Sequence, residues 1–182
     1  METNERSSVE SGMRRVFAVL GSVIFFFLAP GTVAALVPWW ISSWRFQALL
    51  LGFGFLRVVG VLFIVVGGLI LLDSFARFAF QGLGTPAPVF PTRHLVVTGL
   101  YRHERNPIYV ANVLVIVGQG LLFGDVRLLA YGALVCLFFH LVVLGYEEPT
   151  LQETFGREYE NFCAHVLRWL PRARPWRPAA ED

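Results

Sequence analysis

Four long apolar runs constrain this chain more than any other feature of its sequence. They cover residues 16–37, about 48–72, 108–123 and 126–146. A helix of about 20 apolar residues crosses the roughly 30 Å hydrocarbon layer of a bilayer. We therefore expect an all-α membrane protein with about four transmembrane helices. The composition agrees, because only 15% of the residues are charged, against about 25% in soluble domains.

The spacing of the runs predicts how the helices follow one another. Only Gly124 and Asp125 separate the third run from the fourth, so these two spans should form a tight antiparallel hairpin. Pro30 lies inside the first run and should kink it. Arg57 lies inside the second run. We expect it near the non-cytoplasmic boundary, with the effective span shifted toward Phe78, because a guanidinium is costly at the centre of a bilayer.

The placement of the basic residues predicts the orientation. All 15 are arginines. With a cytoplasmic amino terminus, twelve of them lie on the cytoplasmic side, Arg45 and Arg127 lie on the other side, and Arg57 lies within a span. This asymmetry satisfies the positive-inside rule. We predict a multi-pass protein of the cell inner membrane with both termini in the cytoplasm.

We expect one membrane-embedded unit in two parts. Residues 1–80 hold the amino-terminal tail and the first two helices. Residues 81–182 hold a structured cytoplasmic loop, the hairpin and a carboxy-terminal interfacial helix over 152–169. In that helix apolar residues recur at steps of three and four, from Leu151 to Val166, which is typical of an amphipathic helix.

Charge and cysteine usage exclude several classes of partner. The net charge of +2 is small and the arginines are spread along the chain, so no nucleic-acid partner is expected. The two cysteines, Cys136 and Cys163, lie far apart without a Cys-x-x-Cys or Cys/His pattern. We therefore expect no metal site and no disulfide framework.

Polar residues gather where the hairpin begins and where it ends. Asn106 and Pro107 precede the third run, and Glu147 and Glu148 follow the fourth, so the hairpin returns both clusters to one membrane face. Paired carboxylates at the end of a span need cationic or hydrogen-bonding partners, and Arg102 and Arg105 lie across the hairpin. A surface ion cluster that anchors the hairpin at the headgroups is the alternative to a functional site.

Several short motifs follow one another in the second half of the chain. They are Gly99-Leu100-Tyr101, Arg105-Asn106-Pro107-Ile108-Tyr109, Glu147-Glu148-Pro149-Thr150-Leu151, Phe155-Gly156, Tyr159 and Val166 to Pro171. In this order they resemble the integral-membrane methyltransferases typified by isoprenylcysteine carboxyl methyltransferase, which are related to the phospholipid N-methyltransferases. The likeness covers about residues 90–171.

The resemblance implies S-adenosylmethionine as the methyl donor and direct in-line transfer to a small or lipid-like acceptor. A non-catalytic membrane subunit or sensor that retains the fold is the alternative. The residues that would bind the donor are His94, Leu95, Val96, Tyr101, Asn106, Pro107, Ile108, Tyr109 and Glu147.

Two departures from the family pattern bear on the acceptor. Asn106 stands where the family has a histidine. Val143 stands where the prenylcysteine enzymes have an arginine for the substrate carboxylate. We therefore expect an apolar acceptor pocket that is lined by Phe139, Val143 and Leu144 and open to lipid, and we do not expect methyl esterification of a prenylcysteine.

The catalytic base is not identified by the sequence, and three residues are candidates: His140, Arg102 and Arg105. His140 lies seven residues before Glu147, on nearly the same helix face. It is either a general base for the acceptor or a buried histidine that is bonded to backbone or to Asn112. Asp73 and Arg77, four residues apart, are expected to form an ion pair at the end of the second span.

Overall fold

The computed structural model describes residues 21, 23–81, 95 and 97–177. In that part of the chain every regular element is a helix, which confirms the predicted all-α class. Three helical stretches are long and apolar enough to cross a membrane: Val23–Ser42, Phe55–Arg77 and Val126–Phe155. A fourth helix, α4 (Pro107–Phe123), is apolar and 17 residues long.

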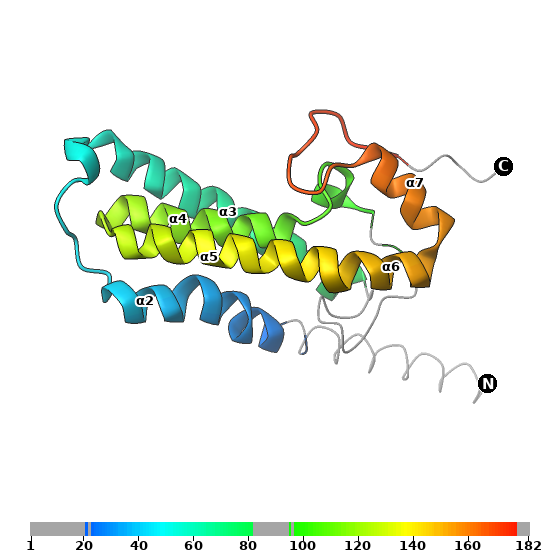
Figure 1. Cartoon of the computed structure of the whole chain (residues 1–182), viewed down its shortest axis with the longest axis horizontal. Helices are drawn as coiled ribbons and strands as arrows, with labels where there is room; N and C mark the ends of the chain where they lie inside the picture. Colours follow the sequence, from blue (N-terminus) through cyan, green and yellow to red (C-terminus); the bar gives the residue numbers. More distant parts are fainter. Residues whose placement is uncertain (1–20, 22, 82–94, 96, 178–182) are drawn as a thin grey trace, which may run out of the picture.

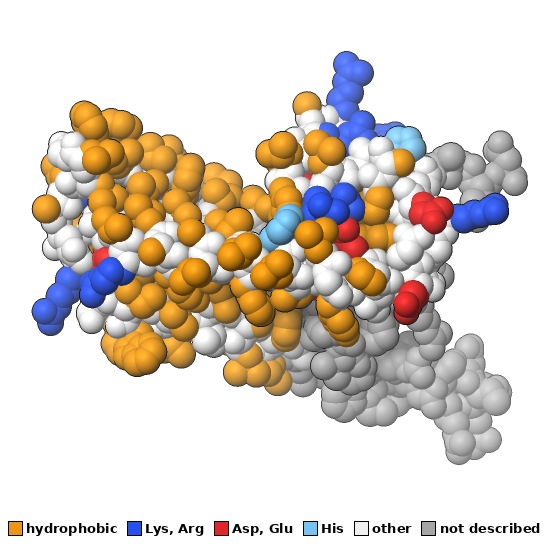
Figure 2. All heavy atoms as spheres, viewed as in Figure 1, with side chains coloured by type: hydrophobic (Ala, Val, Ile, Leu, Met, Phe, Trp, Pro, Cys, Tyr) orange, Lys and Arg blue, Asp and Glu red, His pale blue; other side chains and the backbone are white. Residues whose placement is uncertain are grey.

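The long helices lie side by side as a bundle (Figure 1). The first contains a π-helical turn, η1 (Thr32–Leu36), followed by α2 (Val37–Ser42). Next come α3 (Phe55–Gln81), α4 and α5 (Val126–Val142). Apolar side chains cover much of the bundle surface in this view, and charged side chains gather mainly at its two ends (Figure 2). This is the distribution expected of a helix bundle in a bilayer.

The helical hairpin is present as predicted, and local chemistry explains it. Pro107 occupies the first turn of α4, where its missing N–H is harmless. Gly124 ends α4 with φ 73°, a left-handed conformation that glycine adopts without steric cost. Asp125 then caps α5, because its carboxylate accepts a hydrogen bond from the Arg127 amide at 3.0 Å.

The second span starts later than the apolar run suggested. Residues 48–54 hold only a short 3₁₀ turn, η2 (Leu50–Gly52), and α3 begins at Phe55. Its end at Gln81 agrees with the expected shift toward Phe78. Arg57 therefore lies in the first turn of α3, where it donates to the Gln47 carbonyl at 2.8 Å and lies over the Phe46 ring.

The prediction of one carboxy-terminal helix over 152–169 was wrong. α5 continues through a π-helical turn, η4 (Val143–Glu147), into α6 (Glu148–Phe155). Gly156, with φ 50°, then breaks the helix, and α7 (Arg157–His165) runs in a new direction. The apolar stripe serves a small core: Tyr159, Phe162 and Val166 are buried against Leu95, Val97 and Trp176.

Candidate functional site

Four segments meet at the end of the bundle where α5 continues into α6 (Figure 1). They are the 3₁₀ turn η3 (Gly99–Arg102), the start of α4, the η4–α6 junction and the segment after α7. We call residues 166–177 the C-terminal strap. The hairpin brings the start of α4 and the end of α5 together because the two helices are antiparallel.

A carboxylate and two phenols form the centre of this region. The Tyr109 hydroxyl donates to Glu147 Oε1, and the Tyr109 ring packs on Phe139 with centroids 4.4 Å apart. Burial raises the pKa of Tyr101, and the nearby negative charges of Glu147 and Glu104 raise it further. Tyr101, Tyr109 and Glu147, three of the predicted donor-binding residues, thus lie together.

Glu148 has very different surroundings from its neighbour Glu147. Arg105 Nη1 donates to Glu148 Oε1 at 2.9 Å, and the Arg168 guanidinium binds both Glu148 oxygens at 2.7 and 2.8 Å. Among the residues that the structure describes, no ion pair involves Glu147. The expected pairing of the carboxylates with an arginine is therefore confirmed for Arg105 and Glu148.

The C-terminal strap holds the segment between η3 and α4 in place by backbone hydrogen bonds. The Arg105 amide donates to the Leu167 carbonyl at 3.0 Å, the Arg172 amide to the His103 carbonyl at 3.0 Å, and the Trp176 amide to the Arg102 carbonyl at 2.9 Å. A segment far along the chain thus fixes the residues that lead into the hairpin.

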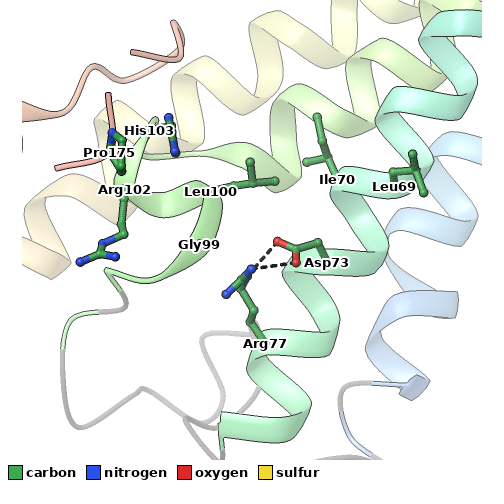
Figure 3. A pocket seen from close by; sticks show the side chains of 9 residues that line it. All are labelled: Leu69, Ile70, Asp73, Arg77, Gly99, Leu100, Arg102, His103 and Pro175. Carbon is green, nitrogen blue, oxygen red and sulfur yellow. Dashed lines mark hydrogen bonds and ion pairs between the residues drawn. The ribbon is translucent and has the colours of Figure 1, made fainter. Parts of the chain in front are cut away.

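A cavity of about 650 Å³ lies beside this centre, between the end of α3 and η3 (Figure 3). Its walls carry the apolar residues Leu69, Ile70, Leu100 and Pro175, the ion pair of Asp73 and Arg77, and Gly99, Arg102 and His103. Arg77 Nε binds Asp73 at 2.8 Å, so the predicted ion pair is confirmed. Arg102 Nε is buried without a hydrogen-bond partner.

The other predicted donor-binding residues are placed as follows. His94 and Val96 lie outside the described residues. Leu95 packs on the core of α7, and Ile108 packs on a cluster of Leu71, Phe75 and Ala111. Pro107 is buried. Asn106 Nδ2 donates to the Arg168 carbonyl at 3.1 Å, so its amide holds the strap. Donor binding by these residues stays a prediction.

The predicted acceptor residues differ in burial. Phe139 and Val143 are buried, with exposures of 9% and 1%, whereas Leu144 is 41% exposed. Phe139 packs in the bundle core, and the cavity beside η3 is lined by other residues. Their role toward an acceptor stays a prediction.

The three catalytic candidates make distinct contacts. His140 Nδ1 is hydrogen-bonded to Trp169 Nε1 at 3.2 Å. Of the two alternatives for His140, a bond to backbone or to Asn112 is not the one observed, because its partner is Trp169 and Asn112 Nδ2 donates to the Ile108 carbonyl. A general-base role for His140 stays a prediction. Arg105 binds Glu148 and also donates to Cys163 Sγ at 2.9 Å. Arg102 lines the cavity.

Sequence reasoning missed Glu104, Arg168 and Trp169. Glu104 is only 6% exposed, and burial raises the pKa of its carboxyl group to about 7. No periodicity marks it, because it lies in the short irregular segment between η3 and α4. The described residues contain no group of three His, Cys, Asp or Glu side chains that could hold a metal ion.

The comparison with known families agrees with this arrangement. The family model for phospholipid methyltransferase matches residues 55–158, more than half of the chain. The chain belongs to the phospholipid methyltransferase family. No curated protein and no solved structure matches it. The matched range includes α3, η3, α4 and α5, and the strap lies outside it. Membership in this family implies a membrane methyltransferase.

Proposed function

We propose that this member of the phospholipid methyltransferase family is an integral-membrane, S-adenosylmethionine-dependent enzyme that methylates a small or lipid-like acceptor. The observation that carries the proposal is the different pairing of two adjacent carboxylates. Glu148 has two arginines, whereas Glu147 has the Tyr109 hydroxyl. A half-buried carboxylate without a cation suits the ammonium group of an amino-acid-like donor.

The surrounding residues fit the rest of such a donor. Tyr101 and Tyr109 supply aromatic faces and hydroxyls beside Glu147, and aromatic rings can stack on an adenine ring. The bound donor would supply an electrophilic methyl group on a sulfonium. In this proposal the chain's own residues orient that donor, align the acceptor with it and exclude water.

For the acceptor, we propose an uncharged or amphipathic nucleophile such as an amine, thiol or hydroxyl on a hydrophobic carrier. Val143, at the position where prenylcysteine enzymes have an arginine, is 1% exposed. It supplies no cation for a substrate carboxylate. Efficient methyl-ester formation on a farnesylcysteine analogue in a radiolabelled transfer assay would contradict this part of the proposal.

Calorimetric titration of the purified full chain with S-adenosylmethionine and S-adenosylhomocysteine tests the central claim. We expect saturable binding of both. An absence of binding at millimolar ligand would exclude the enzyme. Binding without transfer to any membrane-extract component would instead favour the alternative, a non-catalytic membrane subunit or sensor. Asn106 supports that alternative, because its amide is engaged by the strap.

We further propose that the site faces the cytoplasm of a cell with the protein in its inner membrane. The arginine asymmetry supports this orientation, because cytoplasmic loops are enriched in basic residues.

A further inference from the structure

Three histidines in the described part of the chain each make a side-chain hydrogen bond through Nδ1. His103 bonds to the Arg172 carbonyl at 2.8 Å, and His165 bonds to the Asn161 carbonyl at 2.8 Å. His140 is different, because its partner is the indole Nε1 of Trp169 at 3.2 Å.

The partner's chemistry fixes the role of each histidine. A carbonyl oxygen only accepts, so His103 and His165 donate, and they can do so whether neutral or protonated. An indole N–H only donates, so His140 Nδ1 must accept. A protonated imidazole carries a hydrogen on both nitrogens and cannot accept. The bond from Trp169 to His140 therefore exists only while His140 is neutral.

This bond ties the C-terminal strap to the span that ends in Glu147. Trp169 lies between Leu167, which accepts from the Arg105 amide, and Arg172, which bonds to His103. Its ring also packs near the His140 ring, with centroids 5.9 Å apart. The other side-chain bond from the strap to this helix is the Arg168–Glu148 ion pair, on α6.

We propose that His140 is a positioning residue and a pH-sensitive latch for the C-terminal strap. The neutral ring holds Trp169 and keeps the strap against α5. Protonation puts two donors face to face and releases this part of the strap. The release itself does not depend on the proposed function, whereas any effect on donor binding rests on it.

Other titratable groups lie on the elements that pack around His140, and a change of pH could act through them as well. On the helix of His140, Glu147 is bonded to Tyr109 of α4, and Glu148 is paired with Arg105 and Arg168. In the segment that the strap contacts, His103 keeps its bond in acid. Glu104 is buried there, and burial raises the pKa of its carboxyl group to about 7. The experiment must therefore separate His140 from Glu104.

Hydrogen–deuterium exchange of the full chain in lipid nanodiscs, read by mass spectrometry on peptides from 166–177, makes this separation. The amide exchange rates of these peptides are measured at pH 8 and pH 5, and each is divided by the intrinsic exchange rate of an unprotected amide at that pH. We expect exchange in the wild-type strap to speed up by about three- to tenfold at pH 5, the effect of one lost hydrogen bond. His140→Gln, whose amide oxygen accepts at either pH, should exchange slowly at both.

Two further variants complete the test. Trp169→Phe keeps an aromatic ring without the donor, so its strap should exchange fast at both pH values. His103→Gln keeps a donor for the Arg172 carbonyl, and its pH response should match that of the wild type. A wild-type strap without a pH response would overturn the latch. A pH response in His140→Gln as large as in the wild type would also overturn it, and would assign the response to another group such as Glu104.

Calorimetry with S-adenosylhomocysteine at both pH values separates the two proposals. If the latch positions the donor site, affinity should fall more between pH 8 and pH 5 in the wild type than in His140→Gln, because only the wild type loses the bond to Trp169. If no donor binds at either pH, the proposed function fails, and the exchange rates still decide the latch.

Discussion

Glu147 and Glu148 are neighbours in sequence, but their side chains have different partners, Tyr109 for Glu147 and two arginines for Glu148. If Glu147 binds the donor's ammonium, Glu147→Gln should weaken donor binding by about 2–4 kcal/mol, because a charge in a partly desolvated pocket loses its partner. Calorimetry with S-adenosylhomocysteine measures this loss. The variant should still fold, because Tyr109 can donate to the amide oxygen.

Glu148→Gln is the matched control. Glu148 accepts hydrogen bonds from Arg105 and Arg168 and has a 19% exposed side chain. Loss of the Glu148 charge should lower the free energy of unfolding by about 1.5–3 kcal/mol, the range for hydrogen bonds to charged groups. It should affect donor affinity less than Glu147→Gln does. Equal and small effects of the two substitutions on affinity would make the pair a headgroup anchor.

The burial of Glu104 leads us to predict that the free energy of unfolding depends on pH. Its folded pKa of about 7 lies above the ordinary 4.5 because the group is buried. The native state therefore binds this proton more tightly, and stability falls as pH rises from about 4.5 to 7. Glu104→Gln should stabilise the chain at pH 8 by up to about 3 kcal/mol, since one pKa unit corresponds to about 1.4 kcal/mol. The gain should vanish near pH 4.5.

Thermal unfolding in detergent at pH 8 and pH 4.5 measures this difference. Glu153 is exposed on α6, so Glu153→Gln is the control and should change stability little at either pH. A destabilised Glu104→Gln at pH 8 would show that the carboxylate is compensated by a favourable contact.

The residues of the candidate site could be predicted only in part. The resemblance to the methyltransferase family pointed to Tyr101, Tyr109 and Glu147, and the hairpin, whose turn signals are local, explains why they lie together. Donor binding by these residues stays a prediction. Glu104, Arg168 and Trp169 could not be found in this way. The contacts of Arg168 and Trp169 come from the strap, which returns to the site from far along the chain, and no periodicity encodes that return. Glu104 is buried in the short segment between η3 and α4.

At the scale of elements, α3 and α4 approach closely through glycines. A Cβ on Gly60 would lie 2.6 Å from the Gly118 carbonyl oxygen and 2.7 Å from the Leu122 amide nitrogen. Small residues permit such approaches between membrane helices. Gly60→Ala should therefore destabilise the bundle by about 1–3 kcal/mol, the range for overpacking, as measured by thermal unfolding in detergent.

Gly68 on the same helix provides the control. Nothing lies within 4 Å of a Cβ added there. Gly68→Ala should be neutral, or stabilising by up to about 1 kcal/mol, because alanine favours helix more than glycine does. Similar unfolding temperatures for the two variants would contradict close packing at Gly60.

Element boundaries were predictable where the deciding signal is local. Gly124 and Asp125 mark a helix end and a helix cap, so the hairpin was predicted correctly. The tail was misjudged because its apolar stripe continues through Gly156, whose left-handed conformation redirects the chain. The start of α3 was misjudged because residues 48–54 are as apolar as the helix that follows.

At the scale of the whole molecule, the two ends of the bundle differ in content. One end carries the α4–α5 turn and the 43–54 connection, and the other carries η3, α6, α7 and the strap (Figure 1). Everything assigned to donor binding within the described residues lies at this second end. The orientation of the bundle therefore decides which compartment supplies the methyl donor.

Reporter fusions test this orientation. Green fluorescent protein fused after residue 182 should fluoresce, because it folds in the cytoplasm, and alkaline phosphatase fused after Gly52 should be active on the opposite side. The arginine count supports this outcome, with twelve on the predicted cytoplasmic side and two on the other. Exchanging the two reporters is the control, and both exchanged fusions should be inactive. An active phosphatase at the carboxy terminus would place the site away from the cytoplasm, and would require the donor to be supplied from the other side of the membrane.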